Sequence, residues 1–296
     1  MPAGGEPLRG LALDAPAETS GPAQHPTDVP SPQRTWHWPE YLIEAWALGM
    51  FMVSAAGFTV LLEHPASPAR ALIDDPGVRR LLMGLAIGGT AIALIYSRLG
   101  ARSGAHMNPA TTLAFARLGR VAPRDAVAYI LAQFSGALAG LAIASALLSA
   151  WIADPSVNYI VTRPGPLGNA VAFVGEAAIS FGLMLVVLVV SNSRHARWTG
   201  LAAGVLLALY ITIEAPWSGT SLNPARSFAS ALLSGSFQSL WIYFAAPVAG
   251  MAAAAEVYVR RRGTHAIMCA RLNHAGTAHC IFRCRMRSTS AARAAA

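Results

Sequence analysis

The tripeptide Asn-Pro-Ala occurs twice in the chain, and its residue types favour the start of a helix. It stands at Asn108-Pro109-Ala110 and again at Asn223-Pro224-Ala225. Asn is a preferred helix N-cap, and Pro is favoured at the first helical position. The apolar segments that follow, 111–118 and 226–233, are too short to cross a membrane. Each tripeptide is therefore predicted to begin a half-helix.

Two such half-helices can bring hydrogen-bond donors and positive charge to one point. The side-chain oxygen of each Asn can cap its own helix, which leaves the amide N–H groups of Asn108 and Asn223 to bind another oxygen. The helix N-termini add partial positive charge. We expect such a point to accept neutral molecules through an oxygen lone pair and to repel cations.

The composition places these motifs in a membrane. Hydrophobic residues make up 54% of the chain and charged residues 12%, about half the charged share of soluble domains. Soluble enzymes, disordered regulators, collagens and disulfide scaffolds are therefore excluded. Charge-free stretches provide six membrane-spanning helices, and the last one has room for a half-helix, a turn and a span. The stretches are 45–62, 81–97, 126–153, 177–193, 198–213 and 227–255.

The motifs belong to a longer internal repeat. Residues 104–114 and 219–229 share Gly, Asn-Pro-Ala, a hydroxyl residue and Ala in register. Glu44 and Glu176 recur in the first and fourth spans, and a Gly-x-x-x-Gly pattern recurs in the second and fifth. Since three spans separate the copies, they must insert with opposite orientation. The predicted fold is an all-α membrane protein with six transmembrane helices and two re-entrant half-helices in an inverted repeat.

Proline and charge set the predicted boundaries. Residues 1–39 contain eight Pro and no apolar run, so a disordered extension is predicted there. The membrane domain is predicted at 40–260, with repeat one at about 40–151 and repeat two at about 169–260. A basic, disordered tail is predicted at 261–296.

The C-terminal tail carries the net charge. Residues 260–296 hold eight Arg and no acidic residue, which favours contact with anionic lipid headgroups, and nothing favours a nucleic-acid partner. A zinc site is one interpretation of the Cys and His residues there. Because no Cys-x-x-Cys pair or finger spacing is present, free thiols and no metal are predicted instead. These residues are Cys269, Cys280, Cys284, His265, His274 and His279.

The Arg residues also predict an orientation. Five lie between the second and third spans, two between the fourth and fifth, and three directly after the sixth. Arg is enriched in cytoplasmic loops, so both termini are predicted to be cytoplasmic, in the inner (plasma) membrane. The complete absence of Lys hints at a GC-rich genome.

At the segments Ser-Gly-Ala-His-Met-Asn-Pro-Ala (103–110) and Gly-Thr-Ser-Leu-Asn-Pro-Ala-Arg-Ser (219–227), the chain resembles the aquaporin (major intrinsic protein) family. The resemblance covers roughly residues 40–260, and we interpret the chain as a bacterial member. It implies a homotetramer in membrane lipids, each protomer with its own pore for water and small neutral solutes. It implies no enzyme activity and no cofactor. Asn108 and Asn223 would line the pore centre.

The resemblance also implies that Glu44 and Glu176 brace the re-entrant loops by accepting their N–H groups. A proton relay, as in a coupled transporter, is the alternative for a carboxylate in an apolar helix. The symmetric placement of the pair favours bracing. We expect His106 to pack behind its loop, and Glu214 and Glu256 to be solvated at span ends.

The resemblance places a selectivity filter at Arg226, three residues after Asn223, where the first repeat has Thr111. Arg226 would donate to the permeant molecule and repel cations; a salt bridge to a loop acid is the alternative. Counting from the motifs gives the other filter positions: Gly88, Ile211 and Thr220.

The predicted filter matches neither standard subgroup of the family. Water-selective members place an aromatic residue at Gly88 and His at Ile211, and glycerol facilitators place an aromatic residue at Thr220 and Asp after the Arg. Gly and Ile predict a wider, less polar filter that passes glycerol, urea or metalloid hydroxides. Gly88 has a second interpretation as a helix-packing residue. A one-residue slip would put Tyr210 or Thr212 in place of Ile211.

The predicted function is a passive membrane channel for water and small neutral solutes that excludes protons and ions. A water-selective channel is the alternative. A secondary transporter would need a cluster of carboxylates near the midplane, a membrane hydrolase would need a catalytic pair, and a purely structural junction protein is the remaining interpretation.

Overall fold

The computed structural model describes residues 36–274 and 280–285. The predicted N-terminal extension up to residue 35 and the end of the tail, 286–296, lie outside the described residues.

Within the described residues, six helices are long and apolar enough to cross a membrane. Two half-helices begin at the Asn-Pro-Ala motifs, α5 (Pro109–Arg117) and α10 (Pro224–Ser234). The short helix α2 (Pro68–Leu72) links the first two long helices, and the short helices α4 (Arg98–Ser103) and α9 (Ala215–Ser218) precede the loops that lead into the half-helices. The long helices are α1 (Trp38–Glu63), α3 (Pro76–Tyr96), α6 (Pro123–Leu148), α7 (Gly168–Ser191), α8 (Thr199–Ile213) and α11 (Leu240–Arg262). This confirms the predicted fold.

Local sequence sets where these helices begin and end. Asp75 caps α3, since its Oδ1 accepts the N–H groups of Gly77 at 2.7 Å and Val78 at 2.9 Å. Proline occupies the first turn of α3, α5, α6 and α10, where its missing N–H costs no hydrogen bond. The half-helix α10 ends at Gly235, whose φ of 67° favours glycine.

Small residues let the long helices approach in pairs. Helix α1 packs along α6, α7 along α11, and α3 along α8. A Cβ on Gly136 would overlap the backbone of Ala45 in α1, and one on Gly250 would overlap the carbonyl group of Ala177 in α7. The pairs α1–α6 and α7–α11 are equivalent in the two repeats, and α3–α8 joins the repeats.

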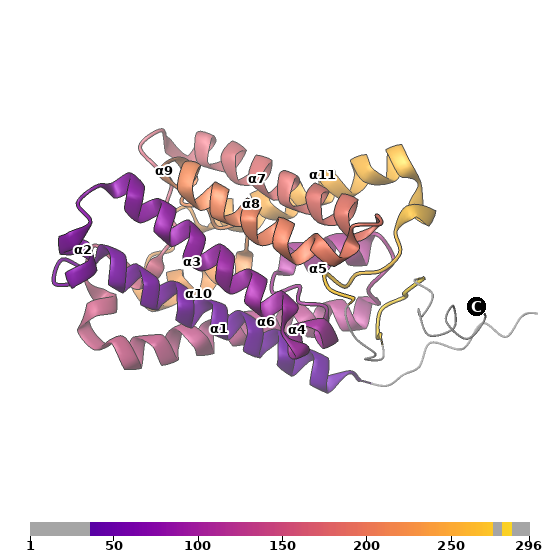
Figure 1. Cartoon of the computed structure of the whole chain (residues 1–296), viewed down its shortest axis with the longest axis horizontal. Coiled ribbons are helices and arrows are strands. Elements are labelled where there is room, and N and C mark those ends of the chain that lie inside the picture. Colours follow the sequence, from indigo (N-terminus) through magenta and orange to yellow (C-terminus); the bar gives the residue numbers. More distant parts are fainter. Residues whose placement is uncertain (1–35, 275–279, 286–296) are drawn as a thin grey trace, which may run out of the picture. The chain divides into compact units, whose positions relative to one another are not determined.

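The half-helices lie between the long helices (Figure 1). Both α5 and α10 pack on α6 and α11, and they also contact each other. Their N-terminal ends meet, because the side chains of Asn108 and Asn223 each reach the loop that precedes the other. The inverted repeat thus brings both motifs to the middle of the bundle.

The tail differs from the expectation of disorder over its described residues. Residues 263–274 and 280–285 fold back onto the bundle, against the loop after α4 and the segment after α5. Ile267, Cys269 and Ala270 are at most 1% exposed, and Phe282 is 5% exposed. The basic composition of the tail suggested a fully solvated segment. These apolar side chains instead stabilise the docked tail, because their removal from water is favourable.

Candidate functional site

The loops before Asn108 and Asn223 share an irregular, symmetric backbone. Ala105 and Met107 have φ values of 54° and 48°, and their counterparts Thr220 and Leu222 have 49° and 56°. This left-handed conformation costs a residue other than glycine about 1–2 kcal/mol. In a membrane every N–H of such a loop also needs an internal partner. Both loops therefore depend on hydrogen bonds from neighbouring helices.

Glu44 supplies those bonds for the first loop. Its side chain is fully buried in α1. One carboxylate oxygen accepts the Ser103 hydroxyl at 2.7 Å and the His106 N–H at 3.1 Å. The other accepts the Met107 N–H at 2.7 Å and the Gln133 amide at 2.9 Å.

Glu176 makes the equivalent contacts from α7. It is also fully buried, and it accepts the Ser218 hydroxyl at 3.0 Å and the N–H groups of Ser221 at 2.5 Å and Leu222 at 2.8 Å. Both oxygens of each carboxylate are therefore occupied by donors of its own loop. This arrangement favours bracing over a proton relay.

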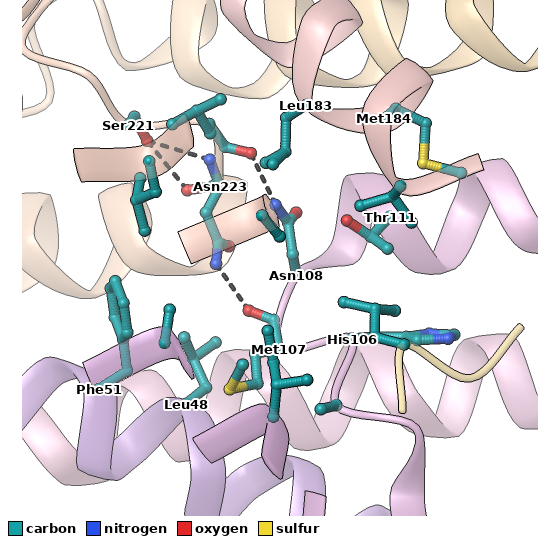
Figure 2. A pocket seen from close by; sticks show the side chains of 18 residues that line it. Leu48, Phe51, His106, Met107, Asn108, Thr111, Leu183, Met184, Ser221 and Asn223 are labelled. Carbon is teal, nitrogen blue, oxygen red and sulfur yellow. Dashed lines mark hydrogen bonds between the residues drawn. The ribbon is translucent and has the colours of Figure 1, made fainter. Parts of the chain in front are cut away.

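Figure 2 shows how the two Asn side chains cross. Each Oδ1 accepts the N–H two residues ahead, at 2.9 Å for Asn108 and 3.1 Å for Asn223, and so caps its half-helix. Asn108 Nδ2 donates to the Leu222 carbonyl at 2.8 Å, and Asn223 Nδ2 donates to the Met107 carbonyl at 2.7 Å. An amide NH₂ carries two protons. One N–H of each Asn therefore stays available.

Two adjoining cavities lie inside the bundle, and the crossing is in the wall of the first. The first, of about 100 Å³, is lined by both Asn residues, by His106 and by Leu272 of the tail. The second, of about 300 Å³, extends toward the opposite end of the bundle, at Glu63 and Arg80. Phe51, Leu207 and Ser221 line both. The cavities thus form successive parts of one path, and most of its wall is apolar.

The second cavity contains three of the four predicted filter residues. Ile211, Thr220 and Arg226 line it, whereas Tyr210 and Thr212 do not. On α3 the lining residues are Arg80, Met83 and Ile87, and Gly88 is not among them. The structure thus brings Ile87, Ile211, Thr220 and Arg226 to the wall of one cavity.

Gly88, the fourth predicted filter residue, packs against α8, in line with its second interpretation as a helix-packing residue. A Cβ on Gly88 would overlap the Gly204 carbonyl oxygen and come within 2.9 Å of the Ala208 Cβ. Gly88 therefore faces α8.

Arg226 and Thr220 have different surroundings. In the described part of the chain, Arg226 Nη1 is buried and has no hydrogen-bond partner, and no ion pair of Arg226 is found there. The Thr220 hydroxyl donates to Glu214 at 2.6 Å. Glu214 is only 5% exposed, so the expectation of a solvated side chain is wrong for it. Glu256 is 43% exposed and pairs with Arg117 and Arg260.

His106 packs behind the first loop. Its ring stacks between Phe115 and Phe282, with centroids 5.2 Å and 5.3 Å away. Nδ1 lies 3.1 Å from the Thr112 hydroxyl, and Nε2 lies 2.9 Å from the Ala270 carbonyl. The ring thereby joins the loop, the half-helix and the tail.

Two tyrosines that the sequence analysis did not single out also hold the loops. The Tyr129 hydroxyl donates to the Ser103 carbonyl, and the Tyr243 hydroxyl donates to the Ser218 carbonyl, both at 2.7 Å. They hold equivalent points of the two loops. The sequence held a signal for this pair, because Tyr129 and Tyr243 are 114 residues apart and the two Asn-Pro-Ala motifs are 115 residues apart.

Comparisons with known proteins agree with this architecture. The family described as Major intrinsic protein matches residues 32–258. Aquaporin NIP1-4 of Oryza sativa subsp. japonica is 38% identical over 213 residues, which cover 71% of this chain and 73% of the relative. Aquaporin NIP1-1 of Zea mays is 39% identical over 189 residues, 63% of each. These relatives are plant proteins, so a bacterial source has no support.

Among solved structures, the aquaglyceroporin from Plasmodium falciparum has the same fold. It aligns with a TM-score of 0.62 and 22% identity, over 75% of this chain and 95% of the other.

The packing of Gly88 predicts a sharp contrast with its neighbour. Gly88→Ala should destabilise the protein by about 1–3 kcal/mol through overpacking against α8. Gly89→Ala is the matched control, because a Cβ there would meet nothing within 4 Å, and alanine favours the helix by up to about 1 kcal/mol. Thermal unfolding in detergent measures both. Equal melting temperatures for the two variants would contradict the packing of Gly88.

Proposed function

The chain belongs to the major intrinsic protein family, and from this we propose that it is a passive channel for water and small neutral solutes that excludes protons and other ions. The observation that carries the proposal is the crossing of Asn108 and Asn223 in the path through the bundle. Each amide has one N–H left for a passing oxygen. Both half-helix N-termini point their positive ends to the same place.

Arg226 is the proposed source of charge selectivity. Its fixed positive charge lines the second cavity, and Nη1 has no protein partner in the described part of the chain. Because water screens charges poorly in a narrow, apolar passage, the repulsion of a cation there is large. A neutral solute can instead accept hydrogen bonds from the guanidinium group.

The proposed filter consists of Ile87, Ile211, Thr220 and Arg226. The two Ile side chains supply neither an aromatic ring nor a second polar wall. The Thr220 hydroxyl proton is already donated to Glu214, so Arg226 is the main donor. This composition supports passage of glycerol, urea or metalloid hydroxides as well as water. The similar proteins, which are named as aquaporins and an aquaglyceroporin, support both kinds of solute.

We also propose a homotetramer in the plasma membrane with both termini in the cytoplasm. The Arg residues of the predicted cytoplasmic loops support this orientation. Leu42 of α1 and Val127 and Leu131 of α6 are 58–66% exposed and border a cavity on the outside of the bundle. Such a face suits a neighbouring protomer or lipid. The channel domain is proposed to extend over residues 40–260.

Proteoliposome flux tests the function directly. Vesicles that contain the purified protein should shrink faster under an osmotic gradient than empty vesicles, with a weak temperature dependence and without any ion gradient. Glycerol, urea and boric acid should also enter. Entry of water alone would support the water-selective alternative, and solute entry only with an ion gradient would support a transporter. A water permeability equal to that of empty vesicles contradicts the proposal.

Filter width is tested at Ile87. Ile87→Trp places a large ring in the second cavity, so we expect glycerol, urea and boric acid fluxes to fall at least tenfold while water flux is largely kept. Leu85→Trp is the control, because Leu85 lies on the same helix and is 57% exposed. Stopped-flow light scattering measures all four fluxes. Undiminished glycerol flux in a folded Ile87→Trp protein would remove Ile87 from the filter.

Charge exclusion is tested at Arg226. Arg226→Val removes the buried positive charge, so proton or cation leak should rise while water still passes. Arg163→Val is the control, since Arg163 is exposed and its guanidinium donates to the Ser236 hydroxyl at 3.3 Å in an exposed contact. A pH-sensitive dye inside the vesicles reports the leak. If the Arg226→Val leak matches that of the control, the half-helix ends alone exclude ions.

A further inference from the structure

The described tail is fastened to the end of the bundle at which the first cavity opens. The Leu272 N–H donates to the Gly104 carbonyl at 3.2 Å, and the Arg283 N–H donates to the Arg120 carbonyl at 3.1 Å. The Met268 N–H donates to the Asn192 side chain at 2.6 Å. These bonds connect the tail to the first loop, to the segment after α5 and to the end of α7.

The same segment takes part in the pore lining. Leu272 lines the first cavity together with both Asn residues, and it is 6% exposed. Two residues before it, the Ala270 carbonyl lies 2.9 Å from His106 Nε2. The tail therefore forms part of the wall of the first cavity at this end of the path.

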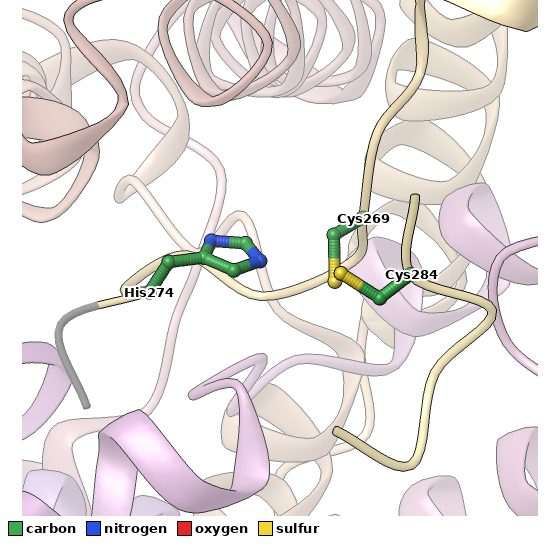
Figure 3. A group of neighbouring side chains, drawn as sticks. All are labelled: Cys269, His274 and Cys284. Atoms are coloured by element: carbon green, nitrogen blue, oxygen red, sulfur yellow. The ribbon is translucent and has the colours of Figure 1, made fainter. Parts of the chain in front are cut away.

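Beside this contact, three metal-binding side chains converge (Figure 3). The ligand atoms of Cys269, His274 and Cys284 all lie within 4.8 Å of one another. The sulfur of Cys280 lies 3.5 Å from that of Cys269. The group thus offers three sulfurs and one imidazole, the donor set of many structural zinc sites.

The His274 ring is an independent pointer to a ligand. Its Nε2 is buried and has no hydrogen-bond partner in the part of the chain that the structure describes, although buried polar atoms are almost always paired. Figure 3 shows the ring pointing toward the sulfurs of Cys269 and Cys284.

The spacing suits a tetrahedral ion after a small closure. Zinc bonds of about 2.3 Å to sulfur and about 2.0–2.1 Å to nitrogen put neighbouring ligand atoms about 3.5–3.8 Å apart. The ligand atoms of Cys269, His274 and Cys284, which lie within 4.8 Å of one another, exceed this by at most about 1 Å, a shift that side-chain rotation can supply. The sulfur of Cys280 is at this spacing from that of Cys269. Lack of finger spacing argued against a metal in the sequence, but the fold brings together ligands from both sides of residues 275–279.

We propose that Cys269, His274 and Cys284, with Cys280 as the fourth ligand, bind a thiophilic cation of the Zn²⁺ type that fastens the tail over this mouth of the path. Cys269 and His274 lie on the segment that carries Leu272, and Cys280 and Cys284 lie on the other. A bound ion would tie the two segments and hold Leu272 at the mouth. Its effect on flux rests on the proposed channel function, whereas ion binding does not.

The first experiment measures binding to the full-length, chelator-treated protein in detergent under reducing conditions. Titration with Zn²⁺ against a chromophoric chelator should give one ion per chain, and Co²⁺ should give thiolate absorption bands. Cys269→Ser, Cys284→Ser and His274→Ala should each weaken binding at least tenfold. His265→Ala is the control, because His265 is an exposed residue of the same tail.

Melting curves of the ion-free variants show whether each is folded. If Cys269→Ser is unstable, Cys284→Ser and His274→Ala still test the site, because both residues are only half-buried. No bound ion, or equal binding by wild type and Cys284→Ser, overturns the site. A Cys269–Cys280 or Cys269–Cys284 disulfide in freshly purified protein, seen by mass spectrometry, also overturns it.

The second experiment measures flux. Zn²⁺ should lower the water permeability of wild-type vesicles at least twofold and leave Cys284→Ser vesicles unchanged. Equal permeability of wild type with and without bound Zn²⁺ overturns the effect on the mouth. A chain that passes no water in either state contradicts the channel proposal instead, and the binding titration still decides the metal site.

Discussion

Two carboxylates buried in apolar helices hold the centre of this structure in place. Glu44 and Glu176 accept the N–H groups of consecutive loop residues, His106 and Met107 in one case and Ser221 and Leu222 in the other. A hydrogen bond to a charged group contributes about 1.5–3 kcal/mol, more than the about 1–2 kcal/mol that a left-handed residue costs. The loops can therefore lie in the interior of the bundle without regular secondary structure. With them fixed, Asn108 and Asn223 meet.

The two repeats contribute equivalent residues to the centre of the path, and differences between the repeats distinguish its two ends. Arg226 stands where the first repeat has Thr111, so one end alone gains a fixed charge beside the path. The first loop has Gln133 as an extra donor to Glu44, and His106 connects that loop to the tail. One end thus carries the proposed filter, and the other carries the tail contact.

The sequence was sufficient for the fold because the evidence there is local and repeated. Charge-free stretches predict spans, and Asn-Pro predicts a helix start wherever it stands. The motif copies predict the inversion. Ile211, Thr220 and Arg226, placed by counting from Asn223, line one cavity. The facing of Gly88 could not be predicted, because a Gly on α3 fits both a filter and a helix-packing role, and only the position of α8 distinguishes them.

Burial was harder to predict than position. Glu214 stands at the end of α8, where solvation was expected, yet the Thr220 hydroxyl and neighbouring helices enclose it. The tail looked disordered because its charge is high, but Ile267, Leu272 and Phe282 find apolar partners on the bundle. Cys269, His274 and Cys284 converge only because the tail docks on the bundle. Their spacing in the sequence is irregular, so the sequence alone did not predict the group.

The proposed channel requires that the crossed Asn side chains each keep one N–H for an oxygen in the path. A high-resolution experimental structure of the channel in lipid, with ordered water, tests this requirement most directly. We expect a water oxygen at about 2.7–3.2 Å from Nδ2 of both Asn108 and Asn223, within a continuous file through the two cavities. Amide groups that are both turned away from the water, or a path closed by protein at this point, would contradict it.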